Sequence, residues 1–230
     1  MSSVDIGEVV ERVLNRMREG DDKPAQPIDR AHRMGVYGTV DEAVDAATHG
    51  QATLIALPLE KRREIISNIR RRTAEDVHTL ARLAHEETGL GRTAHKVHKN
   101  LLVIHRTPGP EILEPIAITG DDGLSLIERA PFGVIGAITP STNPTETIIN
   151  NGIGMLAGGN GVVFNVHPAA RKTSVHYIRM LNQAMVAVGA PDNLFSCIAE
   201  PTIESAGALM KHDRTRIVVV TGGPGVVKAA

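Results

Sequence analysis

Hydrophobic residues recur at helical spacing through the first half of the chain. Between residues 39 and 106, apolar positions return every three or four residues, which places them on one face of a helix. One such series is Val40, Ala43, Val44 and Ala47. The whole region is therefore predicted to be helical, and the run Thr107-Pro108-Gly109-Pro110 is predicted to end it.

After residue 110 the pattern changes to short apolar runs separated by helical segments. The runs predict a strand at 124–128, followed by strands at 133–138, 162–166, 194–198 and 217–220. The segments between them predict helices near 145–156, 169–187 and 202–211. Strands that alternate with helices at this spacing form right-handed βαβ crossovers and a parallel sheet. We predict an α/β fold, in which a Rossmann-like parallel sheet with flanking helices follows the helical region.

The N-terminus carries a separate amphipathic pattern. Residues 3–19 have one apolar stripe, made of Ile6, Val9, Val10, Val13, Leu14 and Met17. The Pro- and Gly-containing residues 20–36 are predicted to be a linker, so the main domain spans residues 37–230. A lone helix of about 15 residues is marginal in water, so the stripe must dock against something. The pattern leaves open whether that is its own domain or a partner.

Small and polar residues follow the predicted strands where ligands bind to parallel sheets. Ligands lie beyond the carboxyl ends of such strands, where backbone amides and helix N-termini can face a dinucleotide. The residues at these ends are Thr139, Pro140, Ser141, Thr142, Asn143, His167, Pro168, Thr221, Gly222 and Gly223. The architecture thus predicts a nucleotide-binding domain.

Composition and charge exclude several other classes. The chain has 25 basic and 26 acidic residues, a balance that gives no electrostatic footprint for nucleic acid. Its single Cys excludes an internal disulfide framework and a thiolate zinc cluster. No apolar run approaches membrane-spanning length, and the first residues do not form a secretory signal. We expect a soluble intracellular protein without a nucleic-acid or membrane partner.

Three features of the sequence resemble functional sites, but we expect each of them to have a structural role or to lie in solvent. The run Gly152-Ile153-Gly154-Met155-Leu156-Ala157 fits the dinucleotide fingerprint, but it ends a predicted helix and follows no strand, so we assign these glycines to packing. Cys197 lies inside a predicted buried strand and is expected to be structural. His85, His95, His98 and His105 are expected to lie on a solvated helix face, with no metal.

The run from Arg129 to Pro144, Arg-Ala-Pro-Phe-Gly-Val-Ile-Gly-Ala-Ile-Thr-Pro-Ser-Thr-Asn-Pro, resembles the aldehyde dehydrogenase superfamily. Its Pro-Ser-Thr-Asn-Pro turn is similar to that of the CoA-acylating branch, as are His167-Pro168 and Thr221-Gly222-Gly223-Pro224-Gly225. The resemblance implies NAD-dependent oxidation of a short-chain aldehyde to acyl-CoA through a Cys thioester, with CoA as co-substrate. In that family the nucleophilic Cys lies well downstream of the Thr221-Gly222-Gly223-Pro224-Gly225 motif. It would therefore lie outside this chain, which we expect to be an incomplete domain, inactive alone.

The resemblance also assigns roles to single residues. The superfamily's oxyanion-stabilising Asn aligns with Thr142, whereas Asn143 is one position later, so both are candidate donors. The alternative that both residues only shape the turn stays open, because Asn, Thr and Pro are common in turns. Asn165 and Pro168 stand where ordinary members hold the adenosine ribose with Lys and Glu, which leaves NAD or NADP open. Arg171 and Lys172 are expected to attract CoA phosphates at a site that overlaps the NAD site, and Val226 is expected to contact the cofactor.

Microcompartment members of this branch carry a similar N-terminal helix that serves as an encapsulation peptide. The resemblance therefore implies that residues 3–19 bind a shell protein, that the protein is cytoplasmic and inside a bacterial microcompartment, and that the full-length enzyme is a homo-oligomer. Two alternatives stay open. The chain is either a stand-alone, non-catalytic nucleotide- or CoA-binding module or a shell-interaction module.

Overall fold

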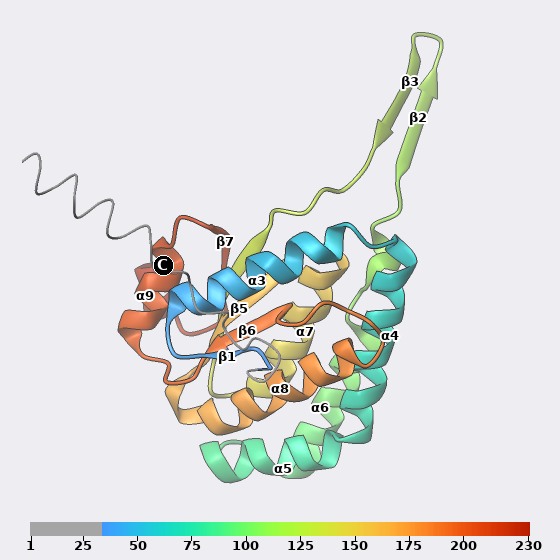
Figure 1. Cartoon of the computed structure of the whole chain (residues 1–230). Helices are drawn as coiled ribbons and strands as arrows, with labels where there is room; N and C mark the ends of the chain where they lie inside the picture. Colours follow the sequence, from blue (N-terminus) through green and yellow to red (C-terminus); the bar gives the residue numbers. More distant parts are fainter. Residues whose placement is uncertain (1–33) are drawn as a thin grey trace, which may run out of the picture. The chain divides into compact units, whose positions relative to one another are not determined.

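The computed structural model describes residues 34–230, and these residues form an α/β domain around one parallel sheet (Figure 1). The predicted docking helix of residues 3–19 and most of the predicted linker lie outside the described residues. Val36, at the end of the predicted linker, already belongs to the first strand, β1 (Val36–Tyr37).

The sheet has five strands, all parallel, in the order β1-β6-β5-β4-β7. The other four strands are β4 (Val134–Ile138), β5 (Gly161–Asn165), β6 (Phe195–Ile198) and β7 (Thr215–Val220). Every residue of β4, β5 and β6 is buried, because helices cover both faces of a parallel sheet. The predicted strands after residue 132 and the predicted parallel sheet are confirmed.

A helix follows each strand from β4 onward, as connections between parallel strands require. α7 (Pro144–Ala157), α8 (Arg171–Val186) and α9 (Ile203–Lys211) follow β4, β5 and β6, and α10 (Pro224–Ala229) follows β7. A short 3-10 turn, η2 (Pro168–Ala170), precedes α8. Pro144 opens α7, which is the position where the missing N–H of proline costs nothing.

The predicted helical region is four helices. They are α3 (Val40–Ile55), α4 (Leu59–Glu75), α5 (Val77–Thr88) and α6 (Thr93–Arg106). α3 begins with a capping box, in which the Thr39 hydroxyl accepts from the Glu42 N–H and the Glu42 carboxylate accepts from the Thr39 N–H, each at 3.2 Å. α5 ends at Gly89, whose φ of 66° is left-handed.

Two apolar cores lie on opposite faces of the sheet. Buried residues of α3 and α9, such as Val44 and Leu209, pack together on one face. Buried residues of α4, α7 and α8, such as Ile69, Ile149 and Leu181, pack on the other. None of the helices within residues 34–230 is long and apolar enough to cross a membrane.

A hairpin leaves the domain between α6 and β4. After the short turn η1 (Pro110–Ile112), β2 (Ile116–Gly120) pairs antiparallel with β3 (Gly123–Ile127), and Figure 1 shows both strands extending away from the helices. The predicted strand at 124–128 is β3, but β2 was not predicted. All ten residues of the two strands are exposed, including Ile116, Ile118, Leu124, Leu126 and Ile127.

Candidate functional site

The carboxyl ends of β4, β5 and β7 meet at one edge of the sheet. Ile138 is in register with Asn165 on one side and with Val220 on the other. Backbone hydrogen bonds extend the pairing by one residue, from Thr139 N–H to the Asn165 carbonyl (3.2 Å) and from Thr221 N–H to the Ile138 carbonyl (3.0 Å). The three predicted segments, 139–143, 167–168 and 221–223, therefore begin side by side.

Two lysines of α6 hold the turn after β4. Lys96 Nζ donates to the Thr142 carbonyl at 3.1 Å, and Lys99 Nζ donates to Asn143 Oδ1. The turn begins at Thr139, whose buried Oγ1 has no hydrogen-bond partner. The lysines were not predicted as site residues, although Lys96 stands beside the apolar stripe of α6 and is only 1% exposed.

An acid lies with these lysines beneath the turn. Glu146 of α7 is 6% exposed, its Oε1 lies 3.5 Å from Lys99 Nζ, and its Oε2 accepts from the Thr145 hydroxyl at 3.2 Å. Burial lowers the pKa of Lys96, Glu146 opposes that shift, and the Lys99 charge adds to it. The cluster therefore combines two cations and one anion directly behind a candidate catalytic turn.

A cleft of about 320 Å³ opens between α6 and α7 next to this turn. Its walls include Lys99, Leu102, Asn143, Glu146, Asn150 and Thr221. The cleft thus joins the end of β4 to the end of β7. Its size suits a small organic molecule.

His167 and Pro168, after β5, are exposed. His167 Nδ1 accepts from the Ala169 N–H at 3.1 Å, so the neutral ring carries its proton on Nε2. Asn165 points into the protein instead, where its Oδ1 accepts from the Ser205 hydroxyl at 2.6 Å. The Asn165 side chain therefore has a hydrogen-bond partner within the domain.

Two acidic residues contact the N-terminus of α8, where Arg171 and Lys172 lie. The N–H groups of Lys172 and Thr173 each donate to the Glu87 carboxylate at 2.7 Å, and Arg171 forms an ion pair with the exposed Glu200. Because Glu87 already satisfies these amides, attraction of a phosphate here must come from the side chains of Arg171 and Lys172. Neither acid was predicted, since each comes from a distant part of the chain.

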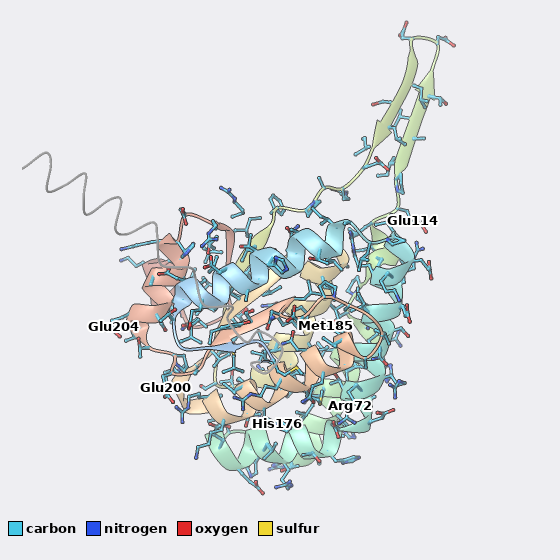
Figure 2. All side chains as sticks on the ribbon, in the orientation of Figure 1. Arg72, Glu114, His176, Met185, Glu200 and Glu204 are labelled. Carbon is cyan, nitrogen blue, oxygen red and sulfur yellow. The ribbon has the colours of Figure 1, made fainter. Side chains whose placement is uncertain are left out.

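A second cleft, of about 680 Å³, lies beside this helix end. It is lined by residues of α5, the η2 turn and α8, among them Glu87, Pro168, Lys172 and His176. Figure 2 shows Glu200 on the same side of the molecule as Glu204, where α9 begins.

The glycine turn after β7 leaves room for a ligand. A Cβ added at Gly223 would meet no atom within 4 Å, and one added at Gly222 would meet only Val226, at 3.5–3.7 Å. Apolar side chains are exposed in the first turns of two helices at this edge of the sheet, Ile203 of α9 (86%) and Val226 of α10 (44%). Ile203 was not predicted as a site residue.

Comparison with known proteins identifies the family. A model of the aldehyde dehydrogenase family matches residues 21–229, which is most of the chain. The chain belongs to this family. It is 46% identical over all 230 residues to the acetylating acetaldehyde dehydrogenase EutE of Salmonella typhimurium and covers 48% of that protein. The chain thus spans about half the length of the curated relatives it matches.

Solved structures of CoA-acylating members share this fold. Propionaldehyde dehydrogenase of Rhodopseudomonas palustris with bound propionyl-CoA has a TM-score of 0.84 and 45% identity, over 90% of this chain and 47% of that one. An engineered glycolyl-CoA reductase with bound NADP+ has a TM-score of 0.83 and 46% identity, over 85% and 45%. The propionaldehyde dehydrogenase C269A mutant from the Clostridium phytofermentans fucose utilisation microcompartment has a TM-score of 0.83 and 49% identity, over 85% and 45%.

In this aldehyde dehydrogenase chain, Cys197 lies within the parallel sheet, in register with Phe164 of β5. It is fully buried in β6, and burial raises the pKa of its thiol to about 12, an effect that the charge of Arg179 only partly offsets. A buried neutral thiol is a poor nucleophile, which supports the structural role predicted for Cys197.

The glycine run in α7 and the histidines were the other sequence features that resembled functional sites. Gly152 and Gly154 lie within α7, and Gly152 packs on the ring of Phe195, as expected of a packing glycine. Within residues 34–230, no three His, Cys, Asp or Glu side chains are grouped so that they could hold a metal ion.

Proposed function

We propose that this chain is the NAD(P)-binding portion of a CoA-acylating aldehyde dehydrogenase. The enzyme would oxidise a short-chain aldehyde to acyl-CoA through a thioester on a Cys outside these 230 residues. The observation that carries the proposal is the meeting of the Thr139–Asn143 turn, His167-Pro168 and Thr221–Gly223 at one sheet edge, next to the cleft between α6 and α7. The CoA-acylating relatives named above support the reaction class.

The residues at this edge fit a dinucleotide. Open space in front of Gly223 lets a pyrophosphate approach the backbone, and the exposed side chains of Ile203 and Val226 offer apolar contacts for an adenine ring. When bound, the nicotinamide accepts the hydride that the aldehyde loses. NAD is the proposed cofactor. NADP is the alternative cofactor to test, because the engineered glycolyl-CoA reductase that shares this fold binds NADP+.

CoA is proposed to use the same edge after the reduced cofactor leaves. Arg171, Lys172 and His167 are the cationic or proton-donating side chains near the start of α8 that would meet its phosphates. The test is calorimetric titration of the purified chain with CoA, with and without saturating NAD. We expect NAD to weaken CoA binding, and undiminished CoA affinity would rule out the shared site.

Aldehyde dehydrogenase activity is proposed to need a catalytic Cys that lies outside these 230 residues. The purified chain should form no NADH from propionaldehyde, CoA and NAD, because its one thiol, Cys197, is buried. Reading the gene beyond Ala230 separates this proposal from a stand-alone binding module. An in-frame domain with a Cys favours the enzyme, and a stop codon favours the module.

The N-terminal segment and the hairpin are proposed to serve assembly. Residues 3–19 would bind a microcompartment shell protein, which fits a structural neighbour that comes from such a compartment. The hairpin would join copies of the enzyme into a homo-oligomer, because isolated two-stranded hairpins are at best marginally stable in water and this one exposes five large apolar side chains.

A further inference from the structure

One ion pair joins the segments that follow two neighbouring strands of the sheet. β5 and β6 are paired in parallel, so the chain leaves Asn165 and Ile198, the last residues of these strands, side by side. Arg171 begins α8 after β5, and Glu200 lies two residues beyond the end of β6. Their side chains form an ion pair, which links the start of α8 to the segment that leads into α9.

The first turn of α9 is held against the end of β5. The Ser205 hydroxyl donates to Asn165 Oδ1 at 2.6 Å. Ile203, the residue proposed above as an adenine contact, is exposed in this same turn and follows Glu200 by three residues. We therefore expect the ribose of a nucleotide whose adenine packs on Ile203 to lie near the Arg171–Glu200 pair.

The two members of the pair differ in exposure. The Arg171 side chain is 32% exposed, whereas the Glu200 side chain is 77% exposed. Exposed ion pairs contribute little stability, so a ligand can compete for either charge. A carboxylate has more acceptor sites than one guanidinium uses, so Glu200 can keep Arg171 on one side and accept from a hydroxyl on the other.

A ribose phosphate meets less favourable surroundings at this end of α8. The Glu87 carboxylate already accepts from the N–H groups of Lys172 and Thr173, each at 2.7 Å, so these amides are not free for a phosphate. Two acids and two cations, Arg171 and Lys172, thus share the helix end, and their charges balance. A phosphate brings further negative charge toward Glu87 and Glu200, and like charges side by side are unfavourable.

We propose that Glu200 selects nucleotides by their ribose, because its carboxylate accepts from the free hydroxyls of the NAD adenosine ribose and disfavours a ribose phosphate. This inference rests on the function proposed above, in which NAD and CoA share the sheet edge. The ion pair with Arg171 holds Glu200 in place for the hydroxyls and must be broken before Arg171 can bind a phosphate. NADP is therefore bound more weakly than NAD. CoA, which also carries a ribose phosphate, is held loosely enough for the acyl-CoA product to leave.

Calorimetric titration of the 230-residue chain with a set of matched nucleotides tests this selection. NAD and 3′-dephospho-CoA carry free ribose hydroxyls, whereas NADP and CoA carry a ribose phosphate. We expect Glu200→Gln to raise the Kd for NAD and for 3′-dephospho-CoA by about 10-fold, the value of one hydrogen bond to a charged group. The same variant should lower the Kd for NADP and for CoA by at least ~3-fold, since the like charge is gone.

Glu204→Gln is the matched control. Glu204 is an exposed acid in the first turn of α9, and its side chain is hydrogen-bonded to Thr202, which lowers its pKa. Its replacement removes the same charge four residues away from Glu200 and should change each Kd by less than ~2-fold, because solvent screens exposed charges. Arg171→Gln should weaken CoA more than 3′-dephospho-CoA. Melting temperatures confirm that each variant is folded.

The full-length enzyme that carries this chain gives the same comparison with the catalytic domain in place. There, Glu200→Gln should lower the ratio of kcat/KM with NAD to kcat/KM with NADP by at least ~10-fold. Shifts of the same sign for all the nucleotides in Glu200→Gln, or equal shifts in Glu204→Gln, would overturn the selection by Glu200. Lack of binding of every nucleotide by both wild-type proteins would instead refute the proposed function, and this inference with it.

Discussion

The backbone of Gly152 in α7 packs directly against the ring of Phe195 in β6. A Cβ added at Gly152 would lie 2.8 Å from Phe195 Cζ and 2.9 Å from Cε2, closer than carbon atoms can approach. Phe195 has no space to move, because it is fully buried and meets Phe164 edge to face, with ring centroids 5.8 Å apart at 87°. The absence of a side chain at Gly152 therefore sets how closely α7 lies on the sheet.

Gly152→Ala should destabilise the chain by about 1–3 kcal/mol, the usual cost of overpacking a core. Gly154→Ala is the matched control, because no atom lies within 4 Å of its added Cβ. That change should stabilise the chain by up to ~1 kcal/mol, since alanine favours a helix interior. Denaturant unfolding of both variants measures the difference. Equal stability of the two would mean that the Phe195 contact does not constrain α7.

Cys197 should be inert toward thiol reagents in the native chain. Its pKa is raised to about 12 by burial, so thiolate is scarce at pH 8 and the sulfur is not accessible. We expect no reaction with Ellman's reagent under native conditions and one thiol per chain after unfolding in guanidinium. Rapid native labelling, or NADH formation that disappears in Cys197→Ser, would contradict the structural role.

The same shift predicts a dependence of stability on pH. The folded pKa lies above the ordinary value of 9.0, so the unfolded chain loses this proton first. Burial of the neutral thiol therefore stabilises the fold fully below pH 9, and this contribution is lost as the pH rises toward 12. The unfolding free energy of Cys197→Ala should fall less steeply than that of the wild type across this range. Parallel curves for the two proteins would contradict it.

Glu87 should matter more for stability than its neighbour Glu86. Glu87→Ala leaves the N–H groups of Lys172 and Thr173 without their acceptor at the start of α8 and should cost about 1–2 kcal/mol. Glu86→Ala removes only a 3.1 Å ion pair to Arg82 between exposed side chains, worth at most ~0.5 kcal/mol. Thermal unfolding compares them, and a similar small loss in both would show that Glu87 does not cap α8.

The hairpin should control association. Opposite residues of an antiparallel pair share a face, so Leu124 and Leu126 lie on one face of the hairpin and Ile116, Ile118 and Ile127 on the other. Leu126→Asp should reduce self-association in sedimentation velocity runs, because it puts a charge into an apolar contact. Gln183→Glu adds a charge at an exposed position of α8 and serves as the control. Identical association of all three proteins would exclude the hairpin as the interface.

The central strands are predictable because burial on both faces gives them continuous apolar runs. The crossover helices are predictable because their apolar residues recur at helical spacing. β1 escapes prediction since two residues carry no periodicity, and β2 escapes it since all of its residues are exposed. The turn residues are predictable because topology places strand ends together. The contacts of Lys99 and Glu87 are not predictable, because in the sequence each looks like an ordinary charged residue on the solvent-exposed face of an amphipathic helix. Their partners depend on how α6 meets α7 and how α5 meets α8, which periodicity does not encode.

The pairing of β1 with β6 also affects how the chain folds during synthesis. Val36 is in register with Cys197, so the first strand waits for a partner that is made about 160 residues later. At roughly 5–20 residues per second, the ribosome needs on the order of ten seconds to deliver that partner. The apolar side of α3, including Val44 and Ala47, is left without its complete sheet for this time. Nascent chains of this protein should therefore be clients of ribosome-associated chaperones, and slower translation of residues 134–198 would lengthen that dependence.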